Sequence, residues 1–341
     1  MLHVRPPHLS PLPSLLLAAA GAIGLLLSAA ASAPAAEAPA AQAAATAKRI
    51  PVILDTDIGD DIDDTWALAL MLKSPELDVK LVVGDHGKSL YRAKLIAKLL
   101  EAAGRTDVAV GIGLGPEKGS GGQAEWVKDY DLAKYPGTVH KDGVQAIIDT
   151  ILKSPQPVTL VAIGPVPNLQ AVLKRAPKIA DRARFVGMHG SVRKGYGGGK
   201  NVAEEYNVKC NPKACQAVFT AAWEMTITPL DTCGLVHLRG AKYAAVRDST
   251  DPLTAALIAN YTLWRGKGKP PADASSTLFD TVAVYLAFAD ALTEIETLGI
   301  RVTDAGRTVI DPAAKKMRVA TKWKDMPAFE DLLVRRLTGG K

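Results

Sequence analysis

The stretch that decides the fold is residues 51–70, which read Pro51-Val-Ile-Leu-Asp-Thr-Asp-Ile-Gly-Asp-Asp-Ile-Asp-Asp-Thr-Trp-Ala-Leu-Ala-Leu70. Three apolar residues, Val52 to Leu54, are typical of a buried strand, and the Ala/Leu-rich end of the stretch is typical of a helix. Between these two segments, six aspartates fall within ten residues. The stretch therefore predicts a strand, an acidic loop and a helix in direct succession.

The same alternation of strand and helix continues along the chain. Short apolar runs predict buried strands at residues 79–83, 108–110, 158–163 and 185–188. Apolar residues at helical spacing predict helices at residues 65–73, 90–103, 143–153, 168–174 and 212–223. This order predicts an α/β fold with a doubly wound, mostly parallel central sheet flanked by helices. Ligands bind such sheets at the carboxyl ends of the strands, so the loops after residues 54, 83, 163 and 188 should converge on one site.

The C-terminal part departs from regular alternation. After residue 251 the pattern predicts helices at residues 253–264 and 278–292, strands near Arg301 and Met317, and a final helix at residues 328–337. No second low-complexity linker interrupts residues 48–341. We therefore expect a single folded domain over these residues.

The N-terminal residues predict export. Arg5 precedes an apolar run at residues 15–27 and a small-residue stretch at residues 28–33, which is the layout of a secretory signal peptide over residues 1–33. The Ala/Pro-rich residues 34–47 are typical of a disordered leader. We expect a periplasmic or extracellular protein. Stable membrane insertion after signal cleavage is not expected, because the apolar run is short for a membrane span.

Charge and cysteine content exclude further classes. The net charge of +6 comes from scattered basic residues without interleaved aromatics, so nucleic-acid binding is not indicated. Three cysteines, Cys210, Cys215 and Cys233, are too few for a disulfide scaffold. An oxidising compartment would permit a bridge between Cys210 and Cys215. The alternative is that these cysteines are buried as small apolar side chains.

The acidic loop predicts a site for a hard cation. Neighbouring aspartates repel one another, and an ionised carboxylate is costly to bury without a partner. Oxygen ligands without a nearby His or Cys favour calcium or magnesium over zinc. The alternative is a solvated loop in which Asp64 caps the helix. An EF-hand beginning at Asp55 is excluded, because its Gly and Glu positions hold Asp60 and Trp66. Asp55 and Asp57 also fit the opening Asp-x-Asp motif of haloacid-dehalogenase phosphatases.

These residues resemble the inosine-uridine nucleoside hydrolase family. Its first strand ends in an Asp-x-Asp, followed by a Gly and an Asp-Asp pair that leads into an Ala/Leu-rich helix. The matching residues here are Asp55, Asp57, Gly59, Asp63 and Asp64. The resemblance continues in order through residues 158–169, 202–207 and 278–280. It implies a nucleoside hydrolase-like fold and calcium-dependent hydrolysis of the N-glycosidic bond of ribonucleosides to ribose and free base. Because family members are often dimers or tetramers, it also implies a homodimer or homotetramer.

The resemblance implies a role for each matching residue. Calcium would be held by the side chains of Asp57, Asp64 and Asp280 and by the backbone carbonyl of Ile163. Asp57 would also be the general base that activates a calcium-held water through an oxocarbenium-like transition state. The residues expected to bind the substrate ribose are Asp63, Asp85, Glu205 and Asn207.

The chain departs from the family pattern in the spacing of the acidic loop. Two extra residues separate Gly59 from the Asp-Asp pair, so Asp61 competes with Asp63 for the place nearest the sugar. Because the predicted helix begins directly after Asp64, we assign the pair to Asp63 and Asp64.

The second departure concerns the leaving group. Well-studied family members place a His before the last aspartate to protonate the departing base, and this chain has Phe279 there. His189 is our first candidate for the missing proton donor, and Tyr206 and His86 are the others. Phe279 also leaves open a calcium-bound nucleoside-binding or sugar-binding protein without catalysis.

Two segments are candidates for covering the site. The glycine-rich residues 194–200 lack the order of a phosphate-binding loop and predict a mobile loop over the site. Trp126 and Tyr130 lie in a polar, glycine-flanked region, where they could stack on a base or belong to an ordinary surface loop.

Overall fold

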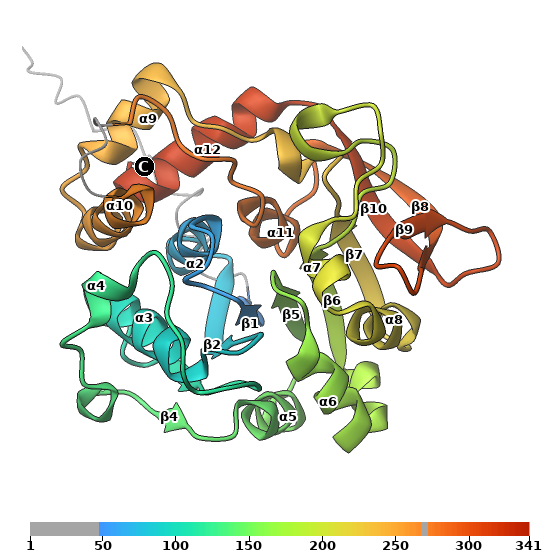
Figure 1. The fold of residues 1–341 in the computed structure, drawn as a ribbon, viewed down its shortest axis with the longest axis horizontal. Coiled ribbons are helices and arrows are strands. Elements are labelled where there is room, and N and C mark those ends of the chain that lie inside the picture. Colours follow the sequence, from blue (N-terminus) through green and yellow to red (C-terminus); the bar gives the residue numbers. More distant parts are fainter. Residues whose placement is uncertain (1–47, 267–271, 341) are drawn as a thin grey trace, which may run out of the picture. The chain divides into compact units, whose positions relative to one another are not determined.

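The computed structural model describes residues 48–266 and 272–340, which form an α/β structure around one twisted sheet (Figure 1). In this part of the chain ten strands lie in the order β4-β3-β2-β1-β5-β6-β7-β10-β8-β9. Neighbours from β4 to β10 pair in parallel, whereas β8 is antiparallel to both β10 and β9. The predicted signal peptide and leader, residues 1–47, lie outside the described residues.

The strands are β1 (Ile50–Thr56), β2 (Leu77–Gly84), β3 (Ala109–Gly111), β4 (Val139–His140), β5 (Val158–Ala162), β6 (Ala183–Met188), β7 (Glu224–Thr228), β8 (Thr293–Val302), β9 (Thr308–Ile310) and β10 (Lys316–Trp323). The α-helices are α2 (Asp63–Leu72), α3 (Ser89–Ala102), α4 (Ala124–Val127), α5 (Gly143–Lys153), α6 (Pro167–Arg175), α7 (Tyr206–Cys210), α8 (Pro212–Thr220), α9 (Gly240–Arg247), α10 (Pro252–Arg265), α11 (Thr281–Leu286) and α12 (Met326–Thr338). Short 3₁₀ helices connect them: η1 (Leu132–Lys134), η2 (Pro177–Arg182), η3 (Tyr196–Gly198) and η4 (Cys233–Leu235).

The central strand β1 is buried on both faces of the sheet. Val52 and Leu54 belong to one apolar cluster and Ile53 to the other, as the two-residue period of a strand requires. Helices α2, α3, α10, α11 and α12 contribute to the first cluster, and α5, α6 and α8 to the second. Figure 1 shows these helix groups on opposite sides of the sheet. A parallel sheet covered on both faces explains why its strands are continuous apolar runs.

The predicted α/β class and its mostly parallel sheet are confirmed, and one predicted helix is wrong in its second half. Helix α11 ends at Leu286, and Thr293 begins strand β8. The Tyr285 hydroxyl accepts a hydrogen bond from the Leu292 amide at 3.1 Å, which fixes the intervening turn. The alternating sequence after Thr293 favours a strand, because β-branched residues fit a pleated surface.

The order in which successive strands are added to the sheet reverses between β1 and β5. Strands β2, β3 and β4 follow β1 on one side, and β5, β6 and β7 extend the sheet on the other. Such a switch point opens a crevice at the carboxyl ends of the strands. Among the described residues, those other than glycine with positive φ lie in the loops beside this crevice: His86, Lys88 and Val166. Backbone strain of this kind is concentrated at functional sites.

The three cysteines are free in the structure. Cys210 is exposed, whereas Cys215 and Cys233 are buried. The bridge considered between Cys210 and Cys215 is therefore absent, and two of the cysteines pack as small apolar side chains. Within residues 48–266 and 272–340, no helix combines the length and apolar character needed to cross a bilayer.

Candidate active site

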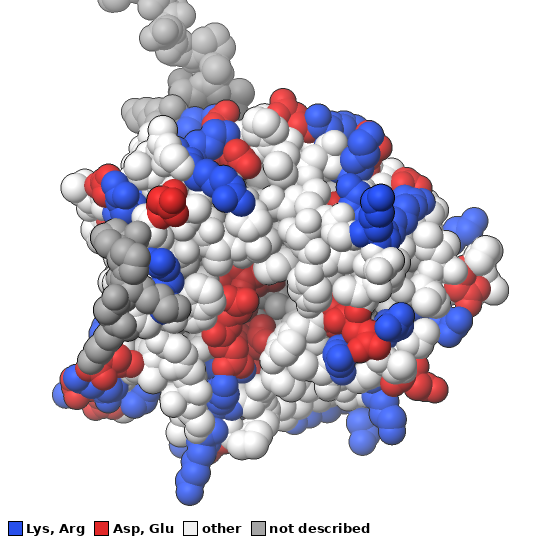
Figure 2. Space-filling model, turned by 45° about the horizontal axis from the view of Figure 1, so that its top comes forward, with Lys and Arg blue, Asp and Glu red and all other residues white. Residues whose placement is uncertain are grey.

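A pocket of about 430 Å³ opens where the strand order reverses, between β1 and β5. Figure 2 shows acidic side chains gathered in a hollow on this face, surrounded mainly by uncharged residues. The pocket is lined by Asp57, Asp60, Asp61, Asp63, Asp64, Ile163, Met188, Tyr196, Glu205, Tyr206, Asn207, Trp264, Phe279 and Asp280. Segments from residue 57 to residue 280 therefore meet at one edge of the sheet.

The turn after β1 directs the acidic loop into this pocket. Gly59 has a φ of +110°, and a Cβ on it would lie 2.6 Å from a ring carbon of Tyr91. Glycine is therefore required at this position. The turn places Asp63 and Asp64 in the first turn of α2, where the positive end of the helix dipole favours negative charge. The Thr56 hydroxyl donates a hydrogen bond to the Asp64 carboxylate.

Three buried carboxylates meet at the bottom of the pocket. One carboxylate oxygen from each of Asp63, Asp64 and Asp280 lies within 4.8 Å of the others. Burial is the largest cause that raises their pKa values, and neighbouring carboxylates add to it: the pKa of Asp63 is about 8, and those of Asp64 and Asp280 lie well above their usual range. Such a group of buried, oxygen-only donors fits a hard divalent cation, which would supply the missing positive charge.

The predicted division between metal ligands and sugar-binding residues stays a prediction. Asp63, which we expected to bind the sugar, lies with Asp64 and Asp280. Asp57 lines the same pocket outside this group of three, as does Ile163. Burial raises the pKa of Asp57 to about 7, and the Arg92 guanidinium opposes this rise. Asp57 is thus a further buried carboxylate in this pocket, and its role as general base stays a prediction.

Glu205 and Asn207 join the pocket to the ends of two strands. The Glu205 carboxylate caps α7 and accepts hydrogen bonds from the backbone amides of Asn207 at 2.7 Å and Gly190 at 2.9 Å. The Asn207 side-chain amide donates to the backbone carbonyls of Ile163 and Met188, both at 3.1 Å. These two of the four predicted sugar-binding residues are therefore held rigidly at the pocket wall.

Two predicted site residues do not line the pocket. Asp85 is fully buried and accepts a hydrogen bond from the Val166 amide at 2.8 Å, so it fixes the strained loop after β5. His189 is also fully buried, lies against the rings of Phe185 and Phe219, and contacts the Gly164 carbonyl oxygen through Nε2 at 3.0 Å. Burial lowers its pKa to about 4. The geometry therefore does not support a sugar contact for Asp85 or proton donation by His189.

Aromatic side chains form the upper wall of the pocket. Tyr196 from the glycine-rich loop packs edge-on against Phe279 with ring centroids 6.0 Å apart, and its hydroxyl accepts a hydrogen bond from the Tyr206 amide at 3.0 Å. The Trp264 indole donates to the Asp60 carbonyl at 3.1 Å. The sequence offered a signal for Tyr196, which stands among glycines. It offered none for Trp264, which reaches the site from the end of α10.

The two aromatic residues considered as a cover for the site, Trp126 and Tyr130, lie away from the pocket. Trp126 and Tyr130 pack partly buried against the apolar core. The Lys98 ammonium lies 4.5 Å from the Trp126 ring centroid and donates to its carbonyl. Neither residue lines the pocket. Their role is to anchor the segment around α4 on α3.

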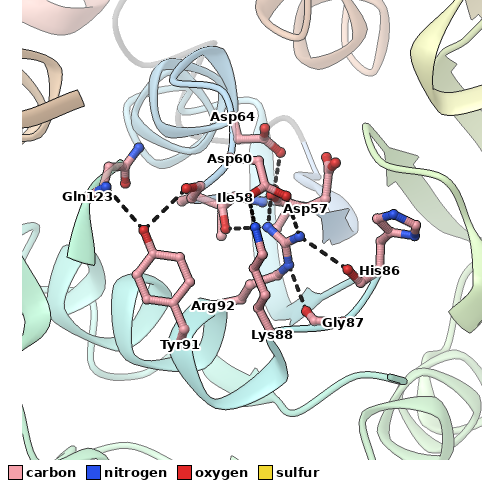
Figure 3. Close-up of polar contacts among 12 residues, drawn as sticks. Asp57, Ile58, Asp60, Asp64, His86, Gly87, Lys88, Tyr91, Arg92 and Gln123 are labelled. Atoms are coloured by element: carbon pink, nitrogen blue, oxygen red, sulfur yellow. Dashed lines mark hydrogen bonds and ion pairs between the residues drawn. The ribbon is translucent and has the colours of Figure 1, made fainter. Parts of the chain in front are cut away.

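A buried arginine holds the acidic turn from below, as Figure 3 shows. The side chain of Arg92, from α3, is fully buried. Its guanidinium donates to the backbone carbonyls of Asp57 and Ile58, the latter at 2.7 Å, and to the Asp60 carboxylate at 2.8 Å. It also donates to the Gly87 carbonyl at 2.9 Å in the loop after β2. One side chain thus fixes two neighbouring loops and places positive charge beside the carboxylates.

Lys88 adds a second cation at the edge of this arrangement. Its ammonium forms an ion pair with the Asp60 carboxylate, which also accepts from Arg92. These two partners lower the pKa of Asp60 despite its partial burial. Asp60 is therefore neutralised by the protein itself, unlike the three carboxylates at the bottom of the pocket.

We predict that Arg92→Met destabilises the fold by about 3–5 kcal/mol, because removing one partner leaves buried carbonyls and a carboxylate uncompensated. Arg92→Lys should recover only part of this loss, since an ammonium cannot serve both loops with the planar geometry of a guanidinium. Urea unfolding measures both effects. Arg301→Met removes an exposed ion pair and is the control, with an expected loss of about 1 kcal/mol or less. Equal losses for Arg92→Met and Arg301→Met would contradict the role given to Arg92.

We predict that His189→Gln retains activity within about threefold, whereas loss of a general acid would lower it by about 10²-fold or more. The folded pKa of about 4 lies below the ordinary value of 6.5, so the neutral His189 stabilises the fold above pH 6.5. This contribution is lost as the pH falls toward 4. Between pH 6.5 and 4, the unaltered protein should lose on the order of 3 kcal/mol of unfolding free energy through protonation of His189, and His189→Gln should not show this loss. Urea unfolding at each pH measures both. An unchanged pH dependence, or a hundredfold loss of activity, would overturn this assignment.

Comparison with known proteins places this geometry in a family. The family model described as inosine-uridine preferring nucleoside hydrolase matches residues 52–331. The pyrimidine-specific ribonucleoside hydrolase RihA of Salmonella arizonae is 28% identical over 316 residues, which cover 84% of this chain and 98% of RihA. The structure of the purine-preferring ribonucleoside hydrolase from Gardnerella vaginalis matches with a TM-score of 0.67 at 26% identity, over 85% of this chain and 98% of that one. The plant nucleoside hydrolase PpNRh1 shares the fold, with a TM-score of 0.72 at 22% identity over 85% of this chain and 99% of that one. The chain belongs to the inosine-uridine preferring nucleoside hydrolase family.

Proposed function

We propose that the protein hydrolyses the N-glycosidic bond of ribonucleosides to ribose and free base. The observation that carries this proposal is the buried group of Asp63, Asp64 and Asp280 beside Asp57, at the bottom of a pocket with an aromatic upper wall. Glycosidic cleavage passes through an oxocarbenium-like state, which nearby anions stabilise. The names of the relatives, ribonucleoside hydrolases of differing base preference, support the reaction and leave the base open.

Calcium is the cation that we propose for the site. The donors are carboxylates, with the Ile163 carbonyl in the same pocket and no His or Cys among the described residues that line it. Such ligands suit calcium or magnesium, and calcium accepts more variable coordination geometries than magnesium does. When bound, calcium supplies positive charge that holds ribose hydroxyls and makes a nearby water more acidic.

The chain's own residues then divide the work between proton transfer and orientation. Asp57 takes a proton from the attacking water, which is a role that its raised pKa suits. Asp63 accepts a ribose hydroxyl, and Glu205 and Asn207 orient the remaining sugar oxygens from the opposite wall. Because these groups are fixed before substrate binds, little ordering is needed on the way to the transition state.

A phosphatase of the haloacid-dehalogenase type does not fit this geometry. Its nucleophile would be the first aspartate of the Asp-x-Asp motif, and Asp55 is fully buried. The Asp55 carboxylate accepts a hydrogen bond from the Asn168 side chain at 2.7 Å and does not line the pocket. The described residues that line the pocket include no lysine to bind a phosphoryl group.

A calcium-bound binding protein without catalysis is the remaining alternative. Phe279 stands where a proton donor would be expected, and this substitution favours the alternative. The intact set of Asp57, Glu205 and Asn207 favours catalysis, because a binding protein has no need of a buried carboxylate next to the sugar site. Export to the periplasm or medium, and assembly into a homodimer or homotetramer, complete the proposal.

We predict that the purified mature chain releases ribose from ribonucleosides in the presence of calcium and stops when calcium is chelated. Reducing-sugar release from uridine, cytidine, inosine and adenosine measures this directly. The matched 2′-deoxynucleosides are the control and should be cleaved at least about 100-fold more slowly, since a lost sugar hydroxyl leaves polar groups in the site unpaired. Nucleoside binding without ribose release would instead establish the non-catalytic alternative.

A further inference from the structure

The hairpin of β8 and β9 is joined to the segment that follows β6 through one buried threonine. Thr308 is the first residue of β9 and is 2% exposed. Its hydroxyl donates to the Ser191 carbonyl at 2.8 Å and accepts from the Ser191 amide at 2.9 Å. A Cβ on Gly190, whose φ is +84°, would lie 2.6 Å from the Thr308 methyl carbon. The hairpin therefore lies as close to this segment as a glycine allows.

The residue beside this junction, Gly190, holds the Glu205 carboxylate. One oxygen of this carboxylate accepts from the Asn207 amide at 2.7 Å. The other accepts from the amides of Gly190 at 2.9 Å and Val208 at 3.2 Å. Asn207 and Val208 belong to α7, whereas Gly190 lies just beyond the end of β6. The Gly190 amide therefore sets the position of the carboxylate relative to the sheet, and Thr308 fixes the backbone next to that amide.

The same hairpin contacts α7 on both sides of Glu205. Gly306 has a φ of +74°, and a Cβ on it would lie 2.7 Å from the Lys209 Cα. The Arg307 guanidinium forms an ion pair with Glu204 at 3.1 Å. Helix α7 has only 5 residues, and so short a helix is not stable without contacts to the rest of the protein. Its position therefore depends on the hairpin.

The junction also lies at the base of the glycine-rich loop. The Ser191 hydroxyl donates to the Lys194 carbonyl at 2.6 Å and accepts from the Ala203 amide at 2.9 Å, so it joins the two ends of this loop. Tyr196, which lines the pocket, lies between these ends. Thr308 itself does not line the pocket. Its hydroxyl thus supports two parts of the pocket wall from outside.

We propose that Thr308 is a positioning residue of the pocket: its hydroxyl fixes the backbone at Gly190 and Ser191 and thereby holds the Glu205 carboxylate at the place where the sugar binds. Thr308 acts through Glu205 and not on the substrate itself. The inference rests on the proposed hydrolase function and adds to it a residue from outside the pocket. Because Glu205 orients sugar oxygens before and during the reaction, its displacement should raise KM more than it lowers kcat.

The first test removes the hydroxyl and keeps the shape of the side chain. Thr308→Val leaves both backbone groups of Ser191 unpaired, and we expect KM for uridine to rise about tenfold while kcat changes less than about threefold. Thr308→Ser restores the hydroxyl and should return KM to within about twofold of the unaltered chain. Ribose release in the presence of calcium measures both constants.

Thr293→Val is the matched control, because Thr293 is 1% exposed and donates to the Asp290 carbonyl at 3.0 Å away from the pocket. This variant should lose stability to urea without a rise in KM. In a Glu205→Gln background, Thr308→Val should raise KM less than about twofold, since the two changes disturb one contact. A tenfold rise in that background, or the same rise in Thr293→Val, would overturn the proposal.

A second pair of variants tests the hairpin without altering a buried residue, and thus serves even if Thr308→Val does not fold. Arg307→Met removes the ion pair with Glu204 and should raise KM about twofold or more. Arg301→Met removes the ion pair with Asp311 on the same hairpin and should leave KM unchanged. The two arginine side chains are 51% and 55% exposed, which makes them a close match.

Equal KM values for the two arginine variants would contradict the role given to the hairpin while the hydrolase assignment stands. Binding of uridine without ribose release would overturn the hydrolase assignment alone. The same variants would then be compared by the Kd for uridine, measured by calorimetry, with the same changes expected in Kd as in KM. Absence of both binding and cleavage would overturn the two proposals together.

Discussion

The burial of neighbouring carboxylates is the constraint on which the rest of this structure depends. Asp63, Asp64 and Asp280 approach one another within a few ångströms at the bottom of the pocket, and their raised pKa values express the free energy needed to ionise them there. The buried Arg92 guanidinium, which lies beneath the turn that carries Asp57, supplies part of the positive charge that these carboxylates need. A bound divalent cation would supply the rest. Arg92 and Lys88 form ion pairs with Asp60 at the edge of the pocket, whereas the three central carboxylates are left for the metal.

The fold explains why such an unfavourable group can persist. Strand β1 is buried on both faces and is paired with β2 and β5 over most of its length, so the position at which its loop begins is rigidly defined. Gly59 allows the turn, and Arg92 donates hydrogen bonds to the backbone carbonyls of that turn. On the opposite wall, the Asn207 side chain joins the ends of β5 and β6. The strained residues His86, Lys88 and Val166 lie in the adjoining loops. The free energy gained by packing the sheet thus offsets the cost of the strained backbone and buried charge at the site.

The sequence predicted the parts of this arrangement that depend on local pattern. The apolar run from Val52 to Leu54 and the aspartates after it are sufficient to predict a buried strand and a cation site, because burial and repulsion act within a few residues. Glu205 and Asn207 were found through the family resemblance. The sequence did not predict that Arg92 would reach back to the turn, that Trp264 would complete the wall, or that His189 would point away, because each depends on packing between distant segments. The predicted helix is wrong after Leu286 for a similar reason, because a hydrogen bond to the Tyr285 hydroxyl holds the segment before β8 in a turn.

The central claim is that the carboxylates at the bottom of the pocket form a site for calcium. Isothermal titration of calcium into the purified mature chain tests it most directly, with Asp64→Asn to remove one donor and Asp60→Asn as the matched control from the same loop. We predict one binding site per chain, retained in Asp60→Asn and abolished in Asp64→Asn. Absence of calcium binding in the unaltered chain, or equal affinity in Asp64→Asn and Asp60→Asn, would contradict the account.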